Sequence, residues 1–113
     1  MKSIRIEKIS EQLRRELAPL IQQEFGEEFG LISVTRIYVT PDIKEAKVYF
    51  TTLEPTKEED LLKKLKVRAP HYQHLIGRKL KIKFTPVILF VIDDYQTELS
   101  TVEKRLQEIK DGA

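Results

Sequence analysis

The sequence contains no cysteine, and this absence excludes several kinds of chemistry. Without cysteine there is no disulfide bond, no thiolate zinc site and no cysteine nucleophile. The sequence also has no apolar run long enough to cross a bilayer, and its N-terminus lacks the basic-then-apolar layout of a secretory signal. We therefore expect a cytoplasmic protein with neither a membrane anchor nor a disulfide framework.

The sequence also offers little that could form an active site. It has no Gly-x-Ser-x-Gly motif and no glycine-rich phosphate loop. His71 and His74 have a spacing that places both rings on one helical face, and Asp93 and Asp94 supply carboxylates elsewhere. A metal-dependent hydrolase would need these groups to converge around an open coordination position. Histidines on the surface of a basic helix are more common, so we expect no enzyme activity, no metal and no cofactor.

Acidic residues are absent from residues 61–92, although the whole chain has 18 of them. The same stretch carries eight basic residues, namely Lys63, Lys64, Lys66, Arg68, Arg78, Lys79, Lys81 and Lys83. The rest of the chain has a net charge of −6, against +2 for the whole protein. A basic segment on a mildly acidic body is typical of a protein that binds a phosphate backbone.

The length of 113 residues and the hydrophobic content of 41% predict one domain, residues 1–113, with its core in about residues 4–94. Apolar residues between Ile6 and Ile21 recur at steps of three and four, which predicts a helix. Pro19 lies inside this pattern, so we expect a kink or a restart there. We expect the glycine-flanked acidic residues 26–30 to end the helix as a loop.

Residues 31–40 and 43–52 are rich in β-branched and aromatic side chains and are separated by Pro41 and Asp42, which predicts a β-hairpin. Thr56 and Glu59 have the spacing of a capping box, so the next helix should begin at Lys57. Its apolar positions continue in phase beyond Pro70. We therefore predict two helical segments joined by a kink at Ala69 and Pro70.

Beyond Gly77, apolar and basic residues alternate. Leu80, Ile82 and Phe84 alternate with Lys79, Lys81 and Lys83, which predicts an extended chain. We expect the three lysines to project to one side of this chain and the three apolar side chains to anchor it. Residues 87–92 are nearly all apolar and predict a third, central strand. A final helix is expected at about residues 100–111, where Leu99, Val102, Leu106 and Ile109 form an apolar stripe and Ser100 and Glu103 form a second capping box.

Several strings of the sequence occur in an order that is quite specific. They are residues 12–17, the strand and proline-aspartate turn of residues 34–42 with residues 46–49, and the basic segment of residues 77–86 with residues 90–94. This ordered set resembles the ribosome-binding factor A family, a group of bacterial ribosome-assembly proteins. The element order is also that of a type II KH domain. The resemblance implies an α+β fold: one KH-like domain of order α-β-β-α-kink-α-β, with a three-stranded sheet and a C-terminal helix.

The usual KH domain clamps nucleic acid with a Gly-x-x-Gly loop. Here no two glycines are three residues apart. The family has an Ala-x-Gly kink in place of that loop, and Arg68, Ala69 and Pro70 occupy the matching positions in this chain. Proline can supply a kink by its own chemistry.

The resemblance implies a non-catalytic factor that binds the small (30S) ribosomal subunit and assists late maturation of its 16S rRNA. It also implies links to growth in the cold and to assembly GTPases. We expect a monomer whose RNA-binding residues are the eight basic residues of the acid-free stretch, with Lys79, Lys81 and Lys83 foremost. The competing hypotheses are a protein-docking module with a basic edge that binds an acidic partner and, less favoured, a small metal-dependent hydrolase.

Overall fold

The computed structural model describes residues 4–81 and 84–93. Its elements follow the order α1 (Ile4–Phe29), β1 (Ile32–Val39), β2 (Glu45–Thr52), a short 3-10 helix η1 (Pro55–Lys57), α2 (Glu58–Leu80) and β3 (Val87–Ile92). The predicted α+β class and the β-hairpin are therefore confirmed. The helix expected at residues 100–111 lies outside the described residues.

The three strands form one sheet in the order β1-β2-β3, with β1 antiparallel and β3 parallel to β2. The prediction that residues 87–92 form the central strand is therefore wrong, because β2 is central and β3 is an edge strand. Continuous apolar sequence usually indicates a strand that is buried on both faces. In β3 only Ile88 and Phe90 are buried, whereas Val87 and Leu89 are exposed on the other face.

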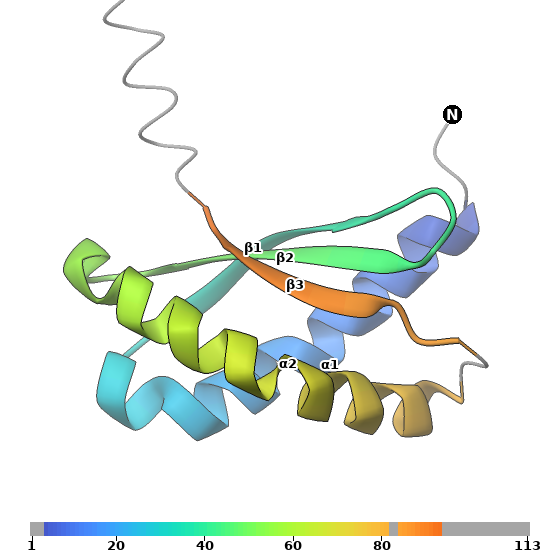
Figure 1. The fold of residues 1–113 in the computed structure, drawn as a ribbon. Helices are drawn as coiled ribbons and strands as arrows, with labels where there is room; N and C mark the ends of the chain where they lie inside the picture. The colour runs from blue at the N-terminus through green and yellow to red at the C-terminus, as the bar shows by residue number, and fades with distance from the viewer. Residues whose placement is uncertain (1–3, 82–83, 94–113) are drawn as a thin grey trace, which may run out of the picture.

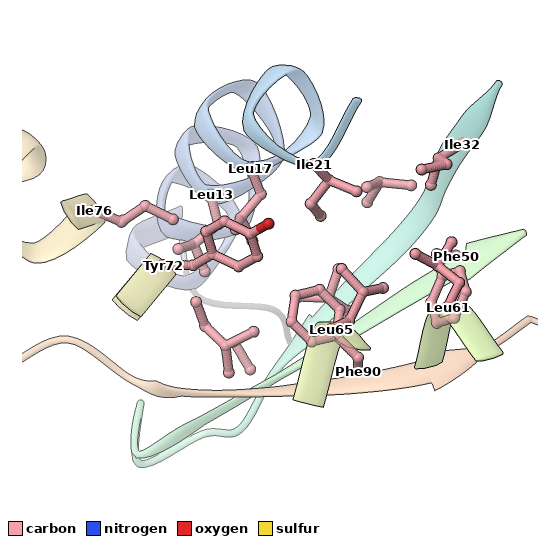
Figure 2. Close-up of a cluster of buried hydrophobic side chains, with 14 of the residues drawn as sticks. Leu13, Leu17, Ile21, Ile32, Phe50, Leu61, Leu65, Tyr72, Ile76 and Phe90 are labelled. Atoms are coloured by element: carbon pink, nitrogen blue, oxygen red, sulfur yellow. The ribbon is translucent and has the colours of Figure 1, made fainter. Parts of the chain in front are cut away.

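Both helices pack against the same face of the sheet (Figure 1). The core lies between these two layers and takes alternate residues of each strand, including Phe50 of β2 and Phe90 of β3 (Figure 2). The helices contribute apolar residues at steps of three and four, for example Leu13, Leu17 and Ile21 of α1, none of which is exposed to solvent. This arrangement leaves the outer face of α2 and the opposite face of the sheet available for function.

Helix α1 continues through the residues that were predicted to form a loop. Phe25 and Phe29 extend the apolar stripe of Leu17 and Ile21 at steps of four, and their rings meet edge to face with centroids 6.3 Å apart. Because burial of Phe29 favours another helical turn, the loop prediction for residues 26–29 is wrong and the helix ends only at Gly30, which has a φ of 73°. The helix assignment is also unbroken at Pro19.

The start of α2 differs from the predicted capping box. Lys57 precedes the helix and no side chain caps its first turn, so Thr56 is not a cap. The carboxylate of Glu58 instead accepts hydrogen bonds from the Thr51 hydroxyl (2.9 Å) and the Thr52 N–H (3.3 Å). These bonds attach the first turn of α2 to the end of β2.

Helix α2 is continuous from Glu58 to Leu80, so the two predicted segments form one helix with Pro70 inside it. Figure 1 shows α2 bending along its length. The predicted extended chain is wrong for Lys79 and Leu80, because Leu80 continues the stripe of Tyr72 and Ile76 and packs against the core. The helix ends at Lys81, whose left-handed backbone (φ 52°, ψ 39°) turns the chain toward β3.

Candidate nucleic-acid interface

The solvent-facing side of α2 carries a row of exposed residues, most of which are lysine or arginine. Lys63, Lys66, Pro70, His74 and Arg78 recur at steps of three and four, so they share one helical face. Lys81 follows at the C-terminal end, and all six residues are exposed. We call Lys63, Lys66, His74, Arg78 and Lys81 the α2 ridge. Among the residues that the structure describes, none of its Lys or Arg side chains forms an ion pair with a carboxylate.

Three other basic residues of the acid-free stretch face α1 and are paired with its carboxylates. Their partners are Glu28 for Lys64 (2.8 Å), Glu24 for Arg68 (2.5 Å) and Glu16 for Lys79 (2.7 Å). Each pair lies partly in solvent, where an ion pair contributes at most about 1 kcal/mol. These contacts offset much of the positive charge that the sequence assigned to RNA binding.

The eight predicted RNA-binding residues therefore fall into separate groups. Lys63, Lys66, Arg78 and Lys81 lie on the α2 ridge, whereas Lys64, Arg68 and Lys79 lie on the side toward α1. The prediction that Lys79 and Lys81 project from one extended chain is wrong, because Lys79 is helical and Lys81 is the helix cap. Lys83, the third member of that row, lies outside the described residues.

A groove runs beside the C-terminal half of the α2 ridge. It has a volume of about 550 Å³ and is lined by Pro70, Gln73, His74, Gly77, Arg78, Phe84 and Thr85. The Gln73 amide donates a hydrogen bond to the Thr85 carbonyl (3.3 Å), which joins the helix to the segment before β3. A Cβ on Gly77 would collide with the Thr85 hydroxyl, so glycine permits this close approach. The groove thus combines a guanidinium, an imidazole and an aromatic ring.

Phe84 is a candidate RNA contact, although its sequence pattern predicted a buried position. Its alternation with lysines predicted a ring anchored in the core, but Phe84 is 75% exposed. The reason is that residues 79 and 80 complete α2, so the alternation does not correspond to a strand. An exposed aromatic ring beside cations is a surface on which a nucleobase can stack.

Tyr72 is unavailable for stacking because it is only 1% exposed. Its hydroxyl donates a hydrogen bond to Oε2 of Glu24 (2.8 Å), the carboxylate that also pairs with Arg68. Nε of Arg68 lies 2.5 Å from Oε1 of Glu24 without an aligned hydrogen bond, while its Nη2 donates to Oε2 at 3.4 Å. This cluster fixes the middle of α2 against α1 and so sets the orientation of the ridge.

Replacing Tyr72 with Phe is expected to lower the free energy of unfolding by about 1–2 kcal/mol, because one buried, charge-assisted hydrogen bond is lost. Urea denaturation followed by circular dichroism measures this change. Tyr38→Phe is a matched control, since Tyr38 is 51% exposed and removal of its hydroxyl should change stability by less than about 0.5 kcal/mol. Equal effects of the two substitutions would contradict a stabilising role for the Tyr72–Glu24 bond.

Burial raises the pKa of Tyr72 above its usual value of 10.0, and the hydrogen bond to Glu24 and the negative charge of that carboxylate raise it further. The native state therefore holds the phenolic proton more tightly than the unfolded chain does. Stability from this proton is fully present below about pH 10 and is lost as the pH rises beyond it. Tyr72→Phe should lose less stability than the unsubstituted protein between about pH 9 and pH 11.

The remaining tyrosines and the histidine pair have different surroundings. Tyr38 is exposed on the face of the sheet opposite the helices, and the guanidinium of Arg36 lies 4.1 Å from the centre of the Tyr49 ring. Tyr95 and Asp94 lie outside the described residues. In the part of the chain that the structure describes, no group of three or more His, Cys, Asp or Glu residues is placed to hold a metal ion. No helix in those ranges is long and apolar enough to span a bilayer.

Sequence reasoning also missed the pairing between the two helices. Glu16, Glu24 and Glu28 are separated by multiples of four residues, so they share one face of α1. That spacing was the available signal that one side of α1 presents carboxylates. The sequence did not show that this side would face α2 rather than solvent.

Comparisons with known proteins agree with this fold. The family model for ribosome-binding factor A matches residues 5–106. The ribosome-binding factor A of Acetivibrio thermocellus is 35% identical over 107 residues, which cover 92% of this chain and 87% of the relative. That of Caldanaerobacter subterraneus subsp. tengcongensis is 32% identical over 110 residues, which cover 92% of this chain and 90% of the relative.

Solved structures show the same architecture. The crystal structure of ribosome-binding factor A from Thermus thermophilus superposes with a TM-score of 0.68 at 22% identity, covering 77% of this chain and 94% of that one. A homology model of the Thermus thermophilus factor, fitted into the cryo-EM map of a 30S–RbfA complex, gives a TM-score of 0.64 at 23% identity. It covers 73% of this chain and 88% of that model. The family match and the identity over most of the sequence show that this chain belongs to the ribosome-binding factor A family.

Proposed function

We propose that this protein binds the small ribosomal subunit and acts there as a non-enzymatic assembly factor during late maturation of 16S rRNA. Family membership supports the proposal, since the Thermus thermophilus factor has been fitted into a map of its complex with the 30S subunit. The proposed setting is the cytoplasm, with the protein acting as a monomer. An assembly GTPase is a further proposed partner.

The α2 ridge is the observation that carries the proposal. It extends from Lys63 to Lys81, a length of about 27 Å at the helical rise of 1.5 Å per residue. Its Lys and Arg side chains have no carboxylate partner within the described ranges, so their charges remain available to phosphate groups. A face that merely keeps a protein soluble usually mixes charges of both signs. RNA is therefore the partner that this face fits best.

The ridge and the adjoining groove can make two kinds of contact. The cations bind the phosphate backbone and fix the position of the RNA, and Arg78 offers a forked donor to a phosphate. The exposed ring of Phe84 provides a face for an unpaired base at the groove. We assign direct contact first to Lys63, Lys66, Arg78 and Lys81, and a weaker contribution to Lys64, Arg68 and Lys79. Lys83 stays a prediction from the sequence.

A protein without an active site can still change the conformation of RNA. It favours whichever RNA conformation it binds more tightly, and the shift in the equilibrium equals the difference between the two binding free energies. The rigid packing of α2 against α1 and the sheet suits this role, because a preformed surface loses little entropy on binding. We propose that the ridge stabilises a maturing conformation of 16S rRNA in this way.

Sedimentation tests the proposal directly. The full chain, mixed with purified 30S and 50S subunits, is expected to migrate with the 30S fraction on a sucrose gradient and to dissociate as salt is raised. Salt releases the protein because its phosphate contacts displace counterions. Equal binding to both subunits would contradict the proposal, because it would show unspecific attraction to phosphate groups. Binding that an excess of acidic peptide abolishes at constant ionic strength would instead support the protein-docking hypothesis.

A further inference from the structure

The sheet has one face that no described element covers (Figure 1). The register of the strands places Tyr38, Lys47 and Leu89 in one row of this open face, and Arg36, Tyr49 and Val91 in the next. Large apolar or aromatic side chains are exposed on it, namely Tyr38 at 51%, Val87 at 47% and Leu89 at 39%. We call this surface the open face.

The composition of the open face changes from one strand to the next. β1 and β2 contribute mainly polar, charged or amphipathic residues such as Arg36, Lys47 and Thr51, as expected for a sheet face in water. β3 contributes only apolar side chains, which are Val87, Leu89 and Val91. A solvated edge strand usually carries charges or proline. The apolar strip along β3 therefore fits a surface that another element covers.

The chain itself supplies a segment that matches this strip. Residues 94–113 follow β3 directly, and Leu99, Val102, Leu106 and Ile109 recur at steps of three and four. Ser100 and Glu103 have the spacing of a capping box at the start of that pattern. The sequence thus predicts an amphipathic helix that begins a few residues beyond the apolar strip of β3.

We propose that residues 100–111 form a helix that packs antiparallel to β3 on the open face. Twelve helical residues span about 18 Å, and the six residues of β3 span about 20 Å. Residues 94–99 would reverse the chain, which is a common length for a connection between a strand and a helix. In this arrangement Leu99 lies toward Val91 and Leu106 lies toward Val87.

The open face carries charges of both signs, because Lys47 lies beside Leu89, Glu45 lies beside Val87, and Arg36 pairs with Asp93 (3.9 Å). The length of residues 94–113, their apolar stripe and their direct continuation from β3 therefore select this occupant. The proposal rests on the open face and on the sequence of residues 94–113, so it stands independently of the proposed function. It implies that RNA reaches the α2 ridge on the other side of the molecule and not the sheet.

The absence of cysteine allows a direct test in the full chain. The double variant Leu89→Cys/Val102→Cys places one thiol on the open face and one on the apolar stripe. Val67→Cys/Val102→Cys is the matched control, because Val67 is 79% exposed on α2, on the helical side of the sheet. The two double variants are oxidised at low protein concentration, which disfavours disulfides between molecules. Mass spectrometry measures how fast the intramolecular disulfide forms in each variant. A packed helix should form the Leu89 crosslink about ten times faster than the control, because packing raises the effective concentration of the thiols.

Equal rates for the two variants would overturn the proposal, as would a faster Val67 crosslink, which would place the segment on α2. Disulfide-linked dimers as the main product would identify a second copy of the chain as the occupant and would also overturn it. Circular dichroism verifies that each variant folds. If Leu89→Cys disturbs folding, Val91→Cys replaces it, because Val91 lies on the same apolar strip of β3.

Discussion

Reversing the charge of three ridge residues, in the variant Lys63→Glu/Lys66→Glu/Arg78→Glu, is expected to weaken binding to the 30S subunit about a hundredfold. Each exposed ion pair with a phosphate contributes up to about 1 kcal/mol, and every 1.4 kcal/mol changes an affinity tenfold. The three side chains point into solvent from α2, so the fold should be retained. Sucrose-gradient co-sedimentation at several protein concentrations measures the loss.

The matched control is Arg5→Glu/Lys8→Glu/Lys44→Glu. These residues are also exposed and produce the same change in net charge, but they lie away from the α2 ridge. The control should bind nearly as well as the unsubstituted protein. Equal losses in the two variants would show that net charge, rather than the ridge, governs association. The slope of log affinity against log salt should also flatten by about 2 in the ridge variant, since each contact with single-stranded RNA contributes about 0.7.

Phe50→Ala is expected to have the largest effect on stability, lowering the free energy of unfolding by about 3–5 kcal/mol. Phe50 has no exposed surface and lies in the central strand of the sheet, where the core receives residues from both helices (Figure 2). Removal of its ring leaves a cavity that the surrounding strands cannot close fully, because β1 and β3 both pair with β2. Equilibrium unfolding in urea measures the change.

Phe84→Ala is the control for this measurement, since it removes the same side chain from a position that is 75% exposed. We expect its free energy of unfolding to change by less than about 0.5 kcal/mol. A small effect at Phe50 would contradict the assignment of this residue to the core. A large effect at Phe84 would show that its ring packs against the protein despite its exposure.

The sequence predicted the elements whose periodicity comes from burial on one face. The hairpin of residues 31–52 and the helix of residues 6–21 follow this rule. Apolar residues at every second position of a strand, or at every third or fourth position of a helix, lie on one face that must be buried. The prediction failed where a short pattern had two explanations. Residues 79–84 alternate as a strand would, yet Leu80 is also in phase with Tyr72 and Ile76, and the longer helical pattern prevailed.

The eight positive charges are a property of the sequence, but their partners are a property of the fold. Spacing alone shows that Lys63, Lys66 and Arg78 share a side of α2. Spacing does not show which side of α2 faces α1. The orientation of α2 in the fold is what brings Lys64, Arg68 and Lys79 to the carboxylates of α1. The tertiary fold also decides which strand is central, because the hydrogen bonds between β2 and β3 join residues that are distant in sequence.

Sequence by itself therefore determined that this chain has an α+β fold, no cysteine and a segment that concentrates positive charge. The tertiary structure decided which of those charges remain available, which aromatic rings are exposed and which face of the sheet is left open. The physical reason is that periodicity and charge are local properties of the chain. Ion pairing and burial depend instead on the approach of α1, α2 and the three strands to one another.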